Sequence, residues 1–385
     1  MTSEWRTIRA ADFIDFNPRL SLKKGDIATK VAMDKLKPFT KKIPETEKAE
    51  FNGGAKFCNG DTVMARITPC LENGKTAYVD MLDDGEIGFG STEFIVMRAK
   101  TGISDPQFVY YTAINPVFRN VAVKSMVGSS GRQRVQQSVL EELELSVPDL
   151  DEQRRIGDFL ARIDEKIALN DRINDNLQQQ AAALFANFYD QAETEVGFTE
   201  MIQILGGGTP KTGESSYWNG DIPFFTPKDV GFPYTLTTEK TITEEGLAHC
   251  NSRLYPINTV FVTARGTVGK VGLPGVPMAM NQSCYALVGK DTHQLLVYFY
   301  TLKAVDRLKH KASGAVFDAI TTRDFEAENI MKLSDDDTKA FLDVAEPIYQ
   351  AVLNNSIENL RLSELRDSLL PKLMNGEIDV TDIRL

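Results

Sequence analysis

Three loops of the sequence combine glycine or proline with small hydroxyl residues and a basic side chain, a combination that suits contact with a phosphate backbone. They are Ser129–Arg134 (SSGRQR), Thr209–Thr212 (TPKT) and Arg265–Lys270 (RGTVGK). Backbone amides of tight turns and Ser or Thr hydroxyls contact phosphates, while Arg, Lys, Asn and Gln read the edges of bases. Together the loops indicate nucleic-acid binding, although each loop taken alone is equally typical of a solvated turn.

Other basic and amide residues of the same segments extend these two candidate surfaces. The candidates of the first half of the chain are Lys23, Lys24, Arg66, Lys75, Ser129, Ser130, Arg132 and Arg134. Those of the second half are Thr209, Lys211, Thr212, Lys228, Arg265, Thr267, Lys270, Asn281 and Gln282.

Motifs of enzymes that act on nucleic acids or nucleotides are missing. An Asn/Asp-Pro-Pro-aromatic motif would orient a flipped adenine for methylation, and the nearest approaches are Asn17-Pro18-Arg19 and Asn115-Pro116-Val117. Gly208–Gly213 has the spacing of a phosphate-binding loop, but Glu214-Ser215 follows where Lys-Ser/Thr is needed. None of the three histidines, His249, His293 and His310, has a cluster of carboxylates or cysteines beside it in the sequence. We therefore predict no catalytic residue, no metal site and no methyl transfer by this chain.

The composition is that of a globular protein large enough for two domains. The 385 residues are 42% hydrophobic and 25% charged. No apolar run approaches the roughly 20 residues that span a bilayer, and the N-terminal stretch lacks a signal-peptide layout. The four cysteines are widely spaced, without a CxxC pair. We expect a cytoplasmic protein with free thiols and no membrane partner.

The net charge of −11 is unevenly distributed. Residues 1–150 hold 20 basic and 20 acidic residues, and residues 196–333 hold 13 of each, so both segments are neutral. In contrast, residues 151–195 hold 5 basic and 10 acidic residues, and residues 334–385 hold 5 basic and 11 acidic residues. The acidic segments would repel a phosphate backbone and suit a protein partner, while the neutral segments can still present basic faces.

Two long helical patterns must position these segments. In the first, apolar residues and asparagines recur every seven residues in two rows, as in a coiled-coil seam. Its rows are Ile156, Ile163, Asn170, Leu177 and Leu184, and Leu160, Ile167, Asn174, Ala181 and Phe188. The second pattern, 185 residues further on, has Phe341, Ile348, Asn355, Leu362 and Leu369, and Ala345, Val352, Asn359 and Arg366.

Both patterns carry their two asparagines at the same heptad step. An Asn in an apolar seam fixes the register, because in a wrong register its amide would lie unpaired in hydrocarbon. We therefore predict that the two helices pack against each other, rather than each covering its own domain. Pro347 lies inside the second pattern, where we expect it to kink the helix or to delay its start to about Ile348.

The globular segment before each helix follows one order of elements. A strand-turn-strand pattern occurs at Phe57–Asp80, with Asn73-Gly74 as the turn, and again at Tyr255–Gly275. Helical periods follow at Pro106–Val123 and Gln294–Lys311. In this alignment Thr62 corresponds to Thr259 and Arg66 to Arg265.

These patterns predict an α+β protein with a pseudo-twofold internal repeat, in which two mixed α/β domains are separated by two long coiled-coil helices. The expected boundaries are 1–150 for the first domain, 151–190 for the central spacer helix, 191–333 for the second domain and 334–385 for the C-terminal spacer helix and tail. Within the helices we expect packing by Ile156, Leu160, Ile163, Ile167, Asn170, Asn174, Leu177, Leu184, Ile348, Val352, Asn355, Asn359, Leu362 and Leu369.

The chain resembles the DNA-specificity subunit of type I restriction-modification systems. The resemblance is carried by DEQRRIGDFLARIDEKIALNDRIN at Asp151–Asn174, GGTPKTGESSYWNGDIPFFTPKDV at Gly207–Val230, ARGTVGKVG at Ala264–Gly272 and LRDSLLPKLMNGEIDV at Leu365–Val380. The first domain has no counterpart of the Gly-Gly-Thr-Pro opening.

The resemblance implies a subunit without catalysis, in which two target-recognition domains each read one half of a split site on double-stranded DNA. It also implies that the two helices pack antiparallel as a spacer that holds these domains apart. Methyltransferase (modification) subunits would dock on this chain and supply S-adenosylmethionine chemistry on adenine, and a restriction/translocase subunit would bring ATP and magnesium. No cofactor would be bound by this chain. A roughly 35-residue helix would span about 50 Å, more than one DNA turn of about 34 Å, so a gapped site is expected.

Two alternatives remain at this stage. A coiled-coil scaffold that binds only proteins would bind its partners independently of salt, because it would release no counterions from DNA. A stand-alone enzyme would methylate or cut DNA by itself.

Overall fold

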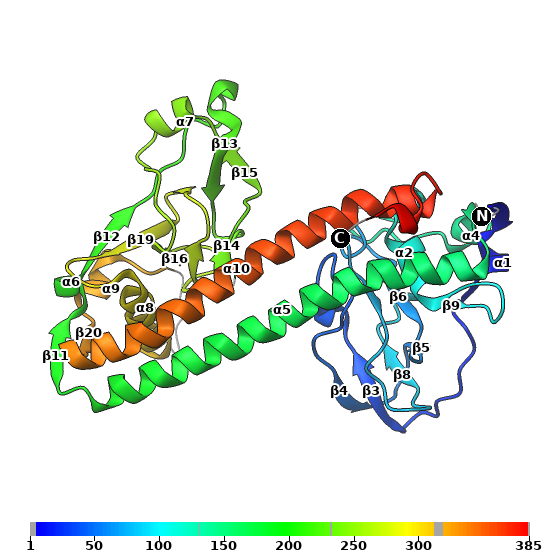
Figure 1. The fold of residues 1–385 in the computed structure, drawn as a ribbon, viewed down its shortest axis with the longest axis horizontal. Coiled ribbons are helices and arrows are strands. Elements are labelled where there is room, and N and C mark those ends of the chain that lie inside the picture. Colours follow the sequence, from blue (N-terminus) through cyan, green and yellow to red (C-terminus); the bar gives the residue numbers. More distant parts are fainter. Residues whose placement is uncertain (1–4, 130, 232, 312–318, 384–385) are drawn as a thin grey trace. The chain divides into compact units, whose positions relative to one another are not determined.

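The computed structural model of the chain describes residues 5–129, 131–231, 233–311 and 319–383 (Figure 1). The chain folds as two compact units. Unit 1 consists of Met1–Ala168 and Arg361–Leu385, and unit 2 of Leu169–Leu360. Two long helices, α5 (Leu150–Gln191) and α10 (Asp335–Met374), each contribute residues to both units.

The remaining elements divide between the units. Those of unit 1 are β1 (Arg6–Arg9), α1 (Ala10–Phe13), β2 (Ile14–Phe16), β3 (Ile27–Val31), the 3-10 helix η1 (Met33–Lys35), β4 (Glu47–Glu50), β5 (Ala55–Phe57), β6 (Thr62–Ala65), β7 (Thr76–Tyr78), β8 (Gly88–Gly90), β9 (Phe94–Ala99), α2 (Pro106–Ile114), α3 (Pro116–Lys124), α4 (Gln137–Glu141), β10 (Glu144–Val147) and the 3-10 helix η3 (Val380–Asp382). Those of unit 2 are β11 (Thr194–Gly197), α6 (Phe198–Met201), β12 (Ile202–Gly206), the 3-10 helix η2 (Ser215–Tyr217), β13 (Trp218–Phe225), β14 (Tyr234–Thr235), β15 (Lys240–Ile242), α7 (Glu244–Ala248), β16 (Val260–Thr263), β17 (Val271–Pro274), β18 (Ala279–Met280), β19 (Cys284–Gly289), α8 (Gln294–Lys311), α9 (Thr322–Glu326) and β20 (Asn329–Lys332).

Unit 1 is built on two four-stranded sheets, in the orders β2-β9-β6-β7 and β4-β3-β8-β5, with β1 and β10 paired beside them. β6 is buried along its whole length, as expected for a central strand covered on both faces. The largest core of the unit packs these strands and α2 against Ile156 and Leu160 of α5 and Leu370 and Leu373 of α10.

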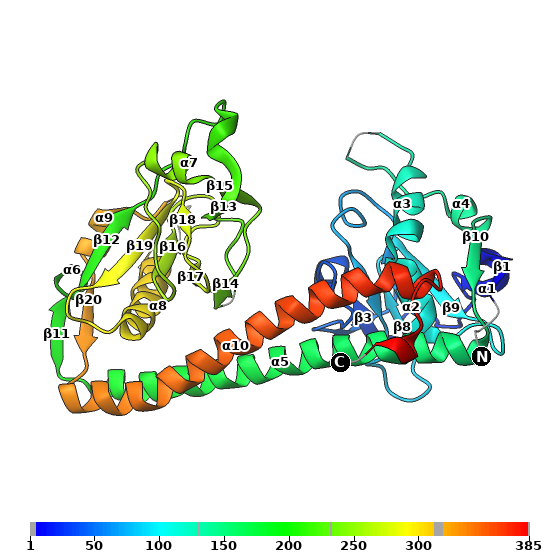
Figure 2. The same ribbon diagram turned by 45° about the horizontal axis from the view of Figure 1, so that its top comes forward.

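Unit 2 repeats this plan. Its main sheet has the order β12-β19-β16-β17-β14, a second sheet has the order β15-β13-β18, and β11 pairs with β20. Figures 1 and 2 show α8 lying against the β12-β19-β16 sheet. The core continues from α8 onto Phe185 of α5 and Phe341 of α10, whose rings lie 5.5 Å apart.

The register of the two main sheets gives the residue correspondence between the repeats. Ala65 pairs with Phe94 in unit 1, and Thr263 pairs with Cys284 in unit 2. Just beyond these pairs, the Arg66 N–H donates to the Glu93 carbonyl, and the Ala264 N–H donates to the Ser283 carbonyl. Arg66 therefore corresponds to Ala264. The alignment of Arg66 with Arg265 was wrong by one residue.

The same correction applies at the start of the strands. Thr62 pairs with Met97, and Val260 pairs with Leu287, so Thr62 corresponds to Val260 rather than to Thr259. The sequence similarity between the two repeats is local, so an alignment shifted by one residue still looks acceptable. The strand register does not allow such a shift, because moving a strand by one residue would turn every side chain to the opposite face of the sheet.

The seam between the long helices contains two asparagine pairs, both in unit 2. Asn170 Nδ2 donates to Asn359 Oδ1 at 2.8 Å, and Asn355 Nδ2 donates to Asn174 Oδ1 at 2.8 Å. From one pair to the next the residue number rises in α5, from 170 to 174, and falls in α10, from 359 to 355, so the helices are antiparallel. Every asparagine of the predicted layers is thus hydrogen-bonded across the seam.

Two predictions about where helices begin and end were wrong. α10 begins at Asp335 and continues through Pro347. Pro347 has no N–H to donate to the Asp343 carbonyl, one turn earlier in the helix. Because Pro347 lies on an exposed side of the helix, water can donate a hydrogen bond to that carbonyl instead. The helix predicted at Pro106–Val123 is two helices, because Pro116 cannot donate and the Asn115 side chain caps α3 by accepting from Val117 N.

Candidate nucleic-acid interface

One edge of the main sheet in each unit gathers the candidate loops. We call it the loop edge, and it lies where β6 or β16 ends and β9 or β19 begins. In unit 2 it consists of residues 207–213, 226–230, 264–270 and 281–283. In unit 1 it consists of Asn17 and residues 66–75, 91–93, 127–129 and 131–135.

In unit 2 the four loops are joined to one another. The hydroxyl of Thr209 donates to the Gln282 side chain. Thr267 Oγ1 donates to the Pro227 carbonyl at 3.1 Å, and the Asn281 N–H donates to the Phe225 carbonyl at 2.9 Å. The structure therefore brings all nine candidates of the second half onto one continuous edge.

Two glycines allow the close approach of these loops. A Cβ on Gly207 would lie 2.1 Å from the Asn281 carbonyl oxygen, so only glycine fits between the first loop and the turn before β19. Gly269 has φ +74° and faces Lys309 of α8, whose Cε would lie 2.6 Å from an added Cβ. Gly207 is thus required by close packing against backbone, whereas Gly269 is required by its left-handed backbone conformation, and the polar residues of both motifs are displayed as a result.

The basic residues of this edge remain available to an anion. Arg265, Lys270 and Lys211 are exposed, and Arg265 has no ion pair with any residue that the structure describes. Lys228 is 80% exposed, with its ammonium 3.7 Å from the Glu239 carboxylate. Asn281 differs, because its Oδ1 accepts from the Ser283 N–H at 3.0 Å and so supports the turn.

In unit 1 the loop of residues 127–134 is closed by paired hydrogen bonds between the backbones of Val127 and Arg134. Ser129 and Arg132 are exposed at its tip, and Ser130 lies outside the described residues. Arg134 forms an ion pair with Glu93 at 2.6 Å, and this guanidinium lowers the pKa of the Glu93 carboxyl. Arg134 therefore helps to hold the edge together, and Arg132 is the freer cation.

The other basic candidates of unit 1 are placed differently. Lys75 is half-buried and its ammonium donates to the Met33 carbonyl at 2.9 Å, which ties the hairpin to η1. Lys23 and Lys24 lie in an exposed turn before β3, where the Lys23 N–H donates to Asp26. No hydrogen bond within the described ranges joins that turn to the loop edge.

One residue that sequence reasoning missed is Lys309, which lies behind Gly269 at the end of α8. It belongs to a basic stretch that also contains Lys303, Arg307 and Lys311. The available signal was this run of cations in the last turns of a helix.

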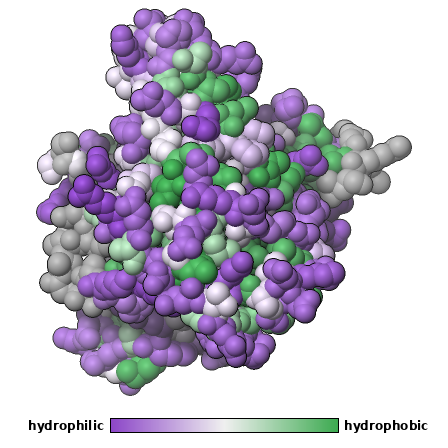
Figure 3. Space-filling view, turned by 90° about the vertical axis from the view of Figure 1, so that its left-hand side faces the viewer, coloured by the Kyte–Doolittle hydropathy of each residue, from purple (hydrophilic) through white to green (hydrophobic). Residues whose placement is uncertain are grey.

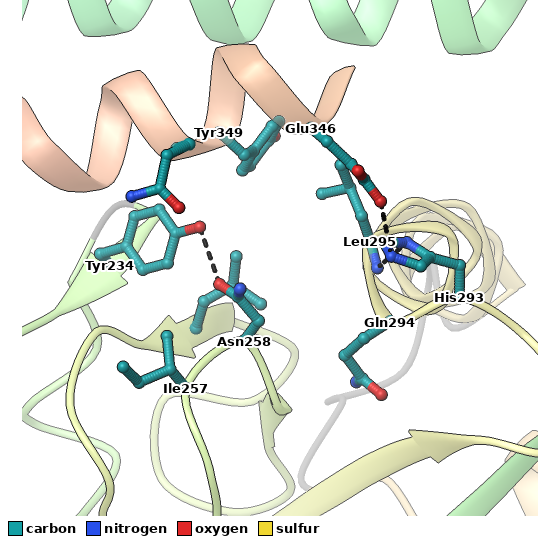
Figure 4. A pocket seen from close by; sticks show the side chains of 10 residues that line it. Tyr234, Ile257, Asn258, His293, Gln294, Leu295, Glu346 and Tyr349 are labelled. Atoms are coloured by element: carbon teal, nitrogen blue, oxygen red, sulfur yellow. Dashed lines mark hydrogen bonds and ion pairs between the residues drawn. The ribbon is translucent and has the colours of Figure 1, made fainter. Parts of the chain in front are cut away.

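A pocket of about 320 Å³ in unit 2 lies between α10 and the strands, and its polar groups are already paired (Figure 4). Tyr234 donates to Asn258 Oδ1 at 2.8 Å, and His293 Nε2 lies 2.7 Å from Glu346. These contacts join the sheet and α8 to α10, and they leave little hydrogen-bonding capacity for a ligand.

The face of unit 2 around β11 and β20 is mainly hydrophilic, with hydrophobic residues in separate patches on its described part (Figure 3). Within the described ranges there is no group of three or more potential metal-ligating side chains. No helix among these residues is long and apolar enough to cross a membrane.

Comparison with known proteins agrees with this arrangement. The family model described as "Type I restriction modification DNA specificity domain" matches residues 3–179 and 194–332, which make up most of the chain. The specificity subunit of the type I restriction enzyme HindI from Haemophilus influenzae is 25% identical over 404 residues, covering 83% of this chain and 86% of that protein. The MjaIX specificity subunit from Methanocaldococcus jannaschii is 32% identical over 124 residues, covering 31% of this chain and 29% of that protein.

The fold is also found in a solved structure. The S subunit of a type I restriction-modification system from M. genitalium superposes with a TM-score of 0.58 at 14% identity, covering 96% of each chain. Each of the two matched segments contains one loop edge. The chain belongs to the family of type I restriction-modification DNA specificity proteins.

Proposed function

We propose that the chain reads a two-part, gapped site on double-stranded DNA, with the loop edge of each unit contacting one half. The observation that carries this proposal is the repeated edge itself. Unit 1 and unit 2 present their loops on the same ends of corresponding strands, in the same sheet order. Two similar edges on one chain fit two separate half-sites.

The long helices suit a different partner. Their segments carry the whole acidic excess of the chain, and Leu169 and Ile173 of α5 are 44% and 40% exposed one turn apart. Acidic surface around exposed apolar residues favours a protein over DNA. We propose that methyltransferase subunits dock here and carry out S-adenosylmethionine-dependent methylation of adenine, so that this chain needs no catalytic residue or cofactor.

A restriction/translocase subunit that uses ATP and magnesium completes the proposed complex. Cleavage and methylation would then act at the site that this chain selects. The supporting observation is the membership of the chain in a family of restriction-modification specificity proteins.

The DNA-binding part of the proposal is tested by Arg265→Ala, measured as duplex affinity of the complex with the host's methyltransferase subunit. We expect a loss of about 1–3 kcal/mol, the range for one good base contact, or a salt slope lower by about 0.9 if the contact is to a phosphate. The matched control is Lys48→Ala in unit 1, an exposed cation that is paired with Glu86 and lies outside both the loop edge and the long helices.

Unchanged affinity of Arg265→Ala at low salt, with circular dichroism showing an intact fold, would remove Arg265 from the interface. Binding of partners that ignores salt, with no duplex binding by wild type, would instead support a protein-only scaffold.

A further inference from the structure

We propose that a pocket on unit 1 binds a backbone phosphate of the target DNA. We call it the cationic pocket. It has a volume of about 580 Å³ and is lined by Asn17, Pro18, Arg19, Leu20, Gly54, Ala55, Lys56, Arg66, Thr92, Phe94 and Val96. This inference deepens the proposed function and rests on it.

All the charged side chains that line the pocket are positive. Arg19, Lys56 and Arg66 line it, and none of the lining residues is acidic. None of the three cations has an ion pair with any residue that the structure describes. Other cations of unit 1 do find carboxylates, as Lys48 does with Glu86 and Arg98 with Asp61. Three unpaired cations around one hollow create a strong local attraction for an anion.

Arg66 supplies the most specific sign of a ligand. Its Nε is buried and has no hydrogen-bond partner. A buried donor without a partner is costly, and native structures rarely tolerate one without a functional reason. A phosphate oxygen in the pocket would accept from this guanidinium, which is the side chain best matched to phosphate geometry.

The walls of the pocket are fixed before any ligand arrives. The Lys56 ammonium donates to the Leu20 carbonyl at 2.9 Å and lies 5.2 Å from the centre of the Phe51 ring. A Cβ on Gly54 would lie 2.0 Å from the Gly90 carbonyl oxygen, so glycine is required where this wall approaches β8. Asn17, with φ +50°, turns the chain into the pocket, and its side-chain Oδ1 accepts a hydrogen bond from the Val96 N–H at 3.0 Å. Such preorganisation lowers the entropic cost of binding.

The pocket opens beside the loop edge of unit 1. The backbone of Arg66 is part of that edge, because its N–H donates to Glu93 and its carbonyl accepts from Val135. A duplex that lies along the edge would therefore bring its phosphates to the mouth of the pocket. Phosphate, rather than a base, matches a site whose specific groups are cations and a Thr hydroxyl.

Unit 2 is built differently at the corresponding place. The strand register makes Phe16, the last residue of β2, equivalent to Ile204 of β12, because they pair with the corresponding residues Met97 and Leu287. Beyond the end of β12, the backbone of Gly207 and Gly208 closes directly on Asn281 and Asn251. The cationic pocket is thus a feature of the first repeat, and it makes the two loop edges unequal in their phosphate contacts.

The test uses the full chain in complex with the methyltransferase subunit, the double variant Arg19→Gln/Lys56→Gln, and duplexes with and without the target site. We expect the variant to weaken both duplexes equally, by about tenfold at 0.1 M salt, and to lower the salt slope by about 0.9. Arg19→Gln alone, at an exposed position, should show a smaller loss without affecting packing. Lys48→Gln is the matched control, because it removes a cation that is already paired.

A second arm replaces single phosphates of the target duplex with neutral methylphosphonates. One position should weaken wild type and have no further effect on the double variant, which identifies the bound phosphate. An unchanged salt slope and no such position would overturn the proposal. So would stabilisation of wild type alone by inorganic phosphate with unchanged DNA binding, which would assign the pocket to a free anion. If wild type bound no duplex at all, the proposed function would fail instead.

Discussion

Lys41 is a buried lysine that connects the first domain to both long helices. It is 7% exposed, its ammonium donates to the Tyr111 hydroxyl at 3.2 Å, and that hydroxyl donates to Asp164 of α5 at 2.5 Å. Asp164 in turn accepts from Arg366 of α10 at 2.6 Å. The chain of contacts explains why Arg366 is tolerated in the heptad row that also contains Ala345 and Val352, since its guanidinium meets the buried Asp164 carboxylate there.

The pKa of Lys41 predicts how the stability of unit 1 depends on pH. Burial lowers this pKa from 10.5 to about 8, against the opposing effect of Asp164. Between these values the unfolded chain holds a proton that the folded chain has released, so the unfolding free energy rises with pH. The shift corresponds to about 3 kcal/mol between pH 7 and pH 11, and the contribution is absent below pH 8.

This prediction is measured as the difference in urea stability between wild type and Lys41→Met. Both carry Trp218→Phe, which leaves Trp5, packed over Gly376 in unit 1, as the one fluorescent tryptophan. The difference should grow in favour of wild type as pH rises. A difference that stays constant from pH 7 to pH 11 would contradict the assignment of a lowered pKa to Lys41.

Individual residues were predicted unevenly from the sequence. Residue type and glycine context were enough to select Thr209, Arg265 and Gln282, which the structure brings together. They were not enough for Arg134, whose charge is matched by Glu93 forty-one positions earlier, or for Lys56. Pairing over such sequence distances depends on strand register, which a single sequence does not reveal.

At the scale of elements, the asparagine pairs set the alignment of α5 and α10. Asn174→Leu should destabilise unit 2 by about 1–3 kcal/mol, because the Asn355 amide loses its partner in a largely apolar seam. Asn174→Leu/Asn355→Leu should recover that loss, since removing both partners of a buried polar pair is often neutral or stabilising.

Thermal unfolding of the wild type, the single variant and the double variant measures this coupling directly. Equal losses in the single and double variants would show that Asn174 acts through other contacts, such as its weak hydrogen bond to the Val352 carbonyl at 3.4 Å.

Elements with a strong period were the most predictable. The helix expected at Gln294–Lys311 has those bounds in the structure. The errors arose at prolines, for two opposite reasons. Pro116 ends a helix because Asn115 caps the next one, whereas Pro347 is accommodated because neighbouring turns of a 40-residue helix are held by the seam. Local propensity cannot separate these cases.

At the scale of the whole molecule, the two long helices are proposed to set the distance between the half-sites. Four residues inserted after Ala168 of α5 and four after Leu360 of α10 fall opposite each other in the antiparallel pair. Each insertion adds about 6 Å of helix, which corresponds to about two base pairs of 3.4 Å. We expect a gap longer by about two base pairs with both half-sites unchanged.

Methylome sequencing of a host that carries the insertion variant reads out this gap. Retention of the original gap would show that the helices do not set the spacing. Changed half-sites would show that they also influence recognition within the units.

The most direct test of the account is co-purification of this chain with the methyltransferase subunit of its host, followed by single-molecule methylome sequencing with and without the chain. We predict a stable complex and a gapped, two-part methylated-adenine motif that disappears when the chain is deleted. Failure to co-purify, together with a methylome that does not change on deletion, would contradict the central claim that this chain directs methylation by reading DNA.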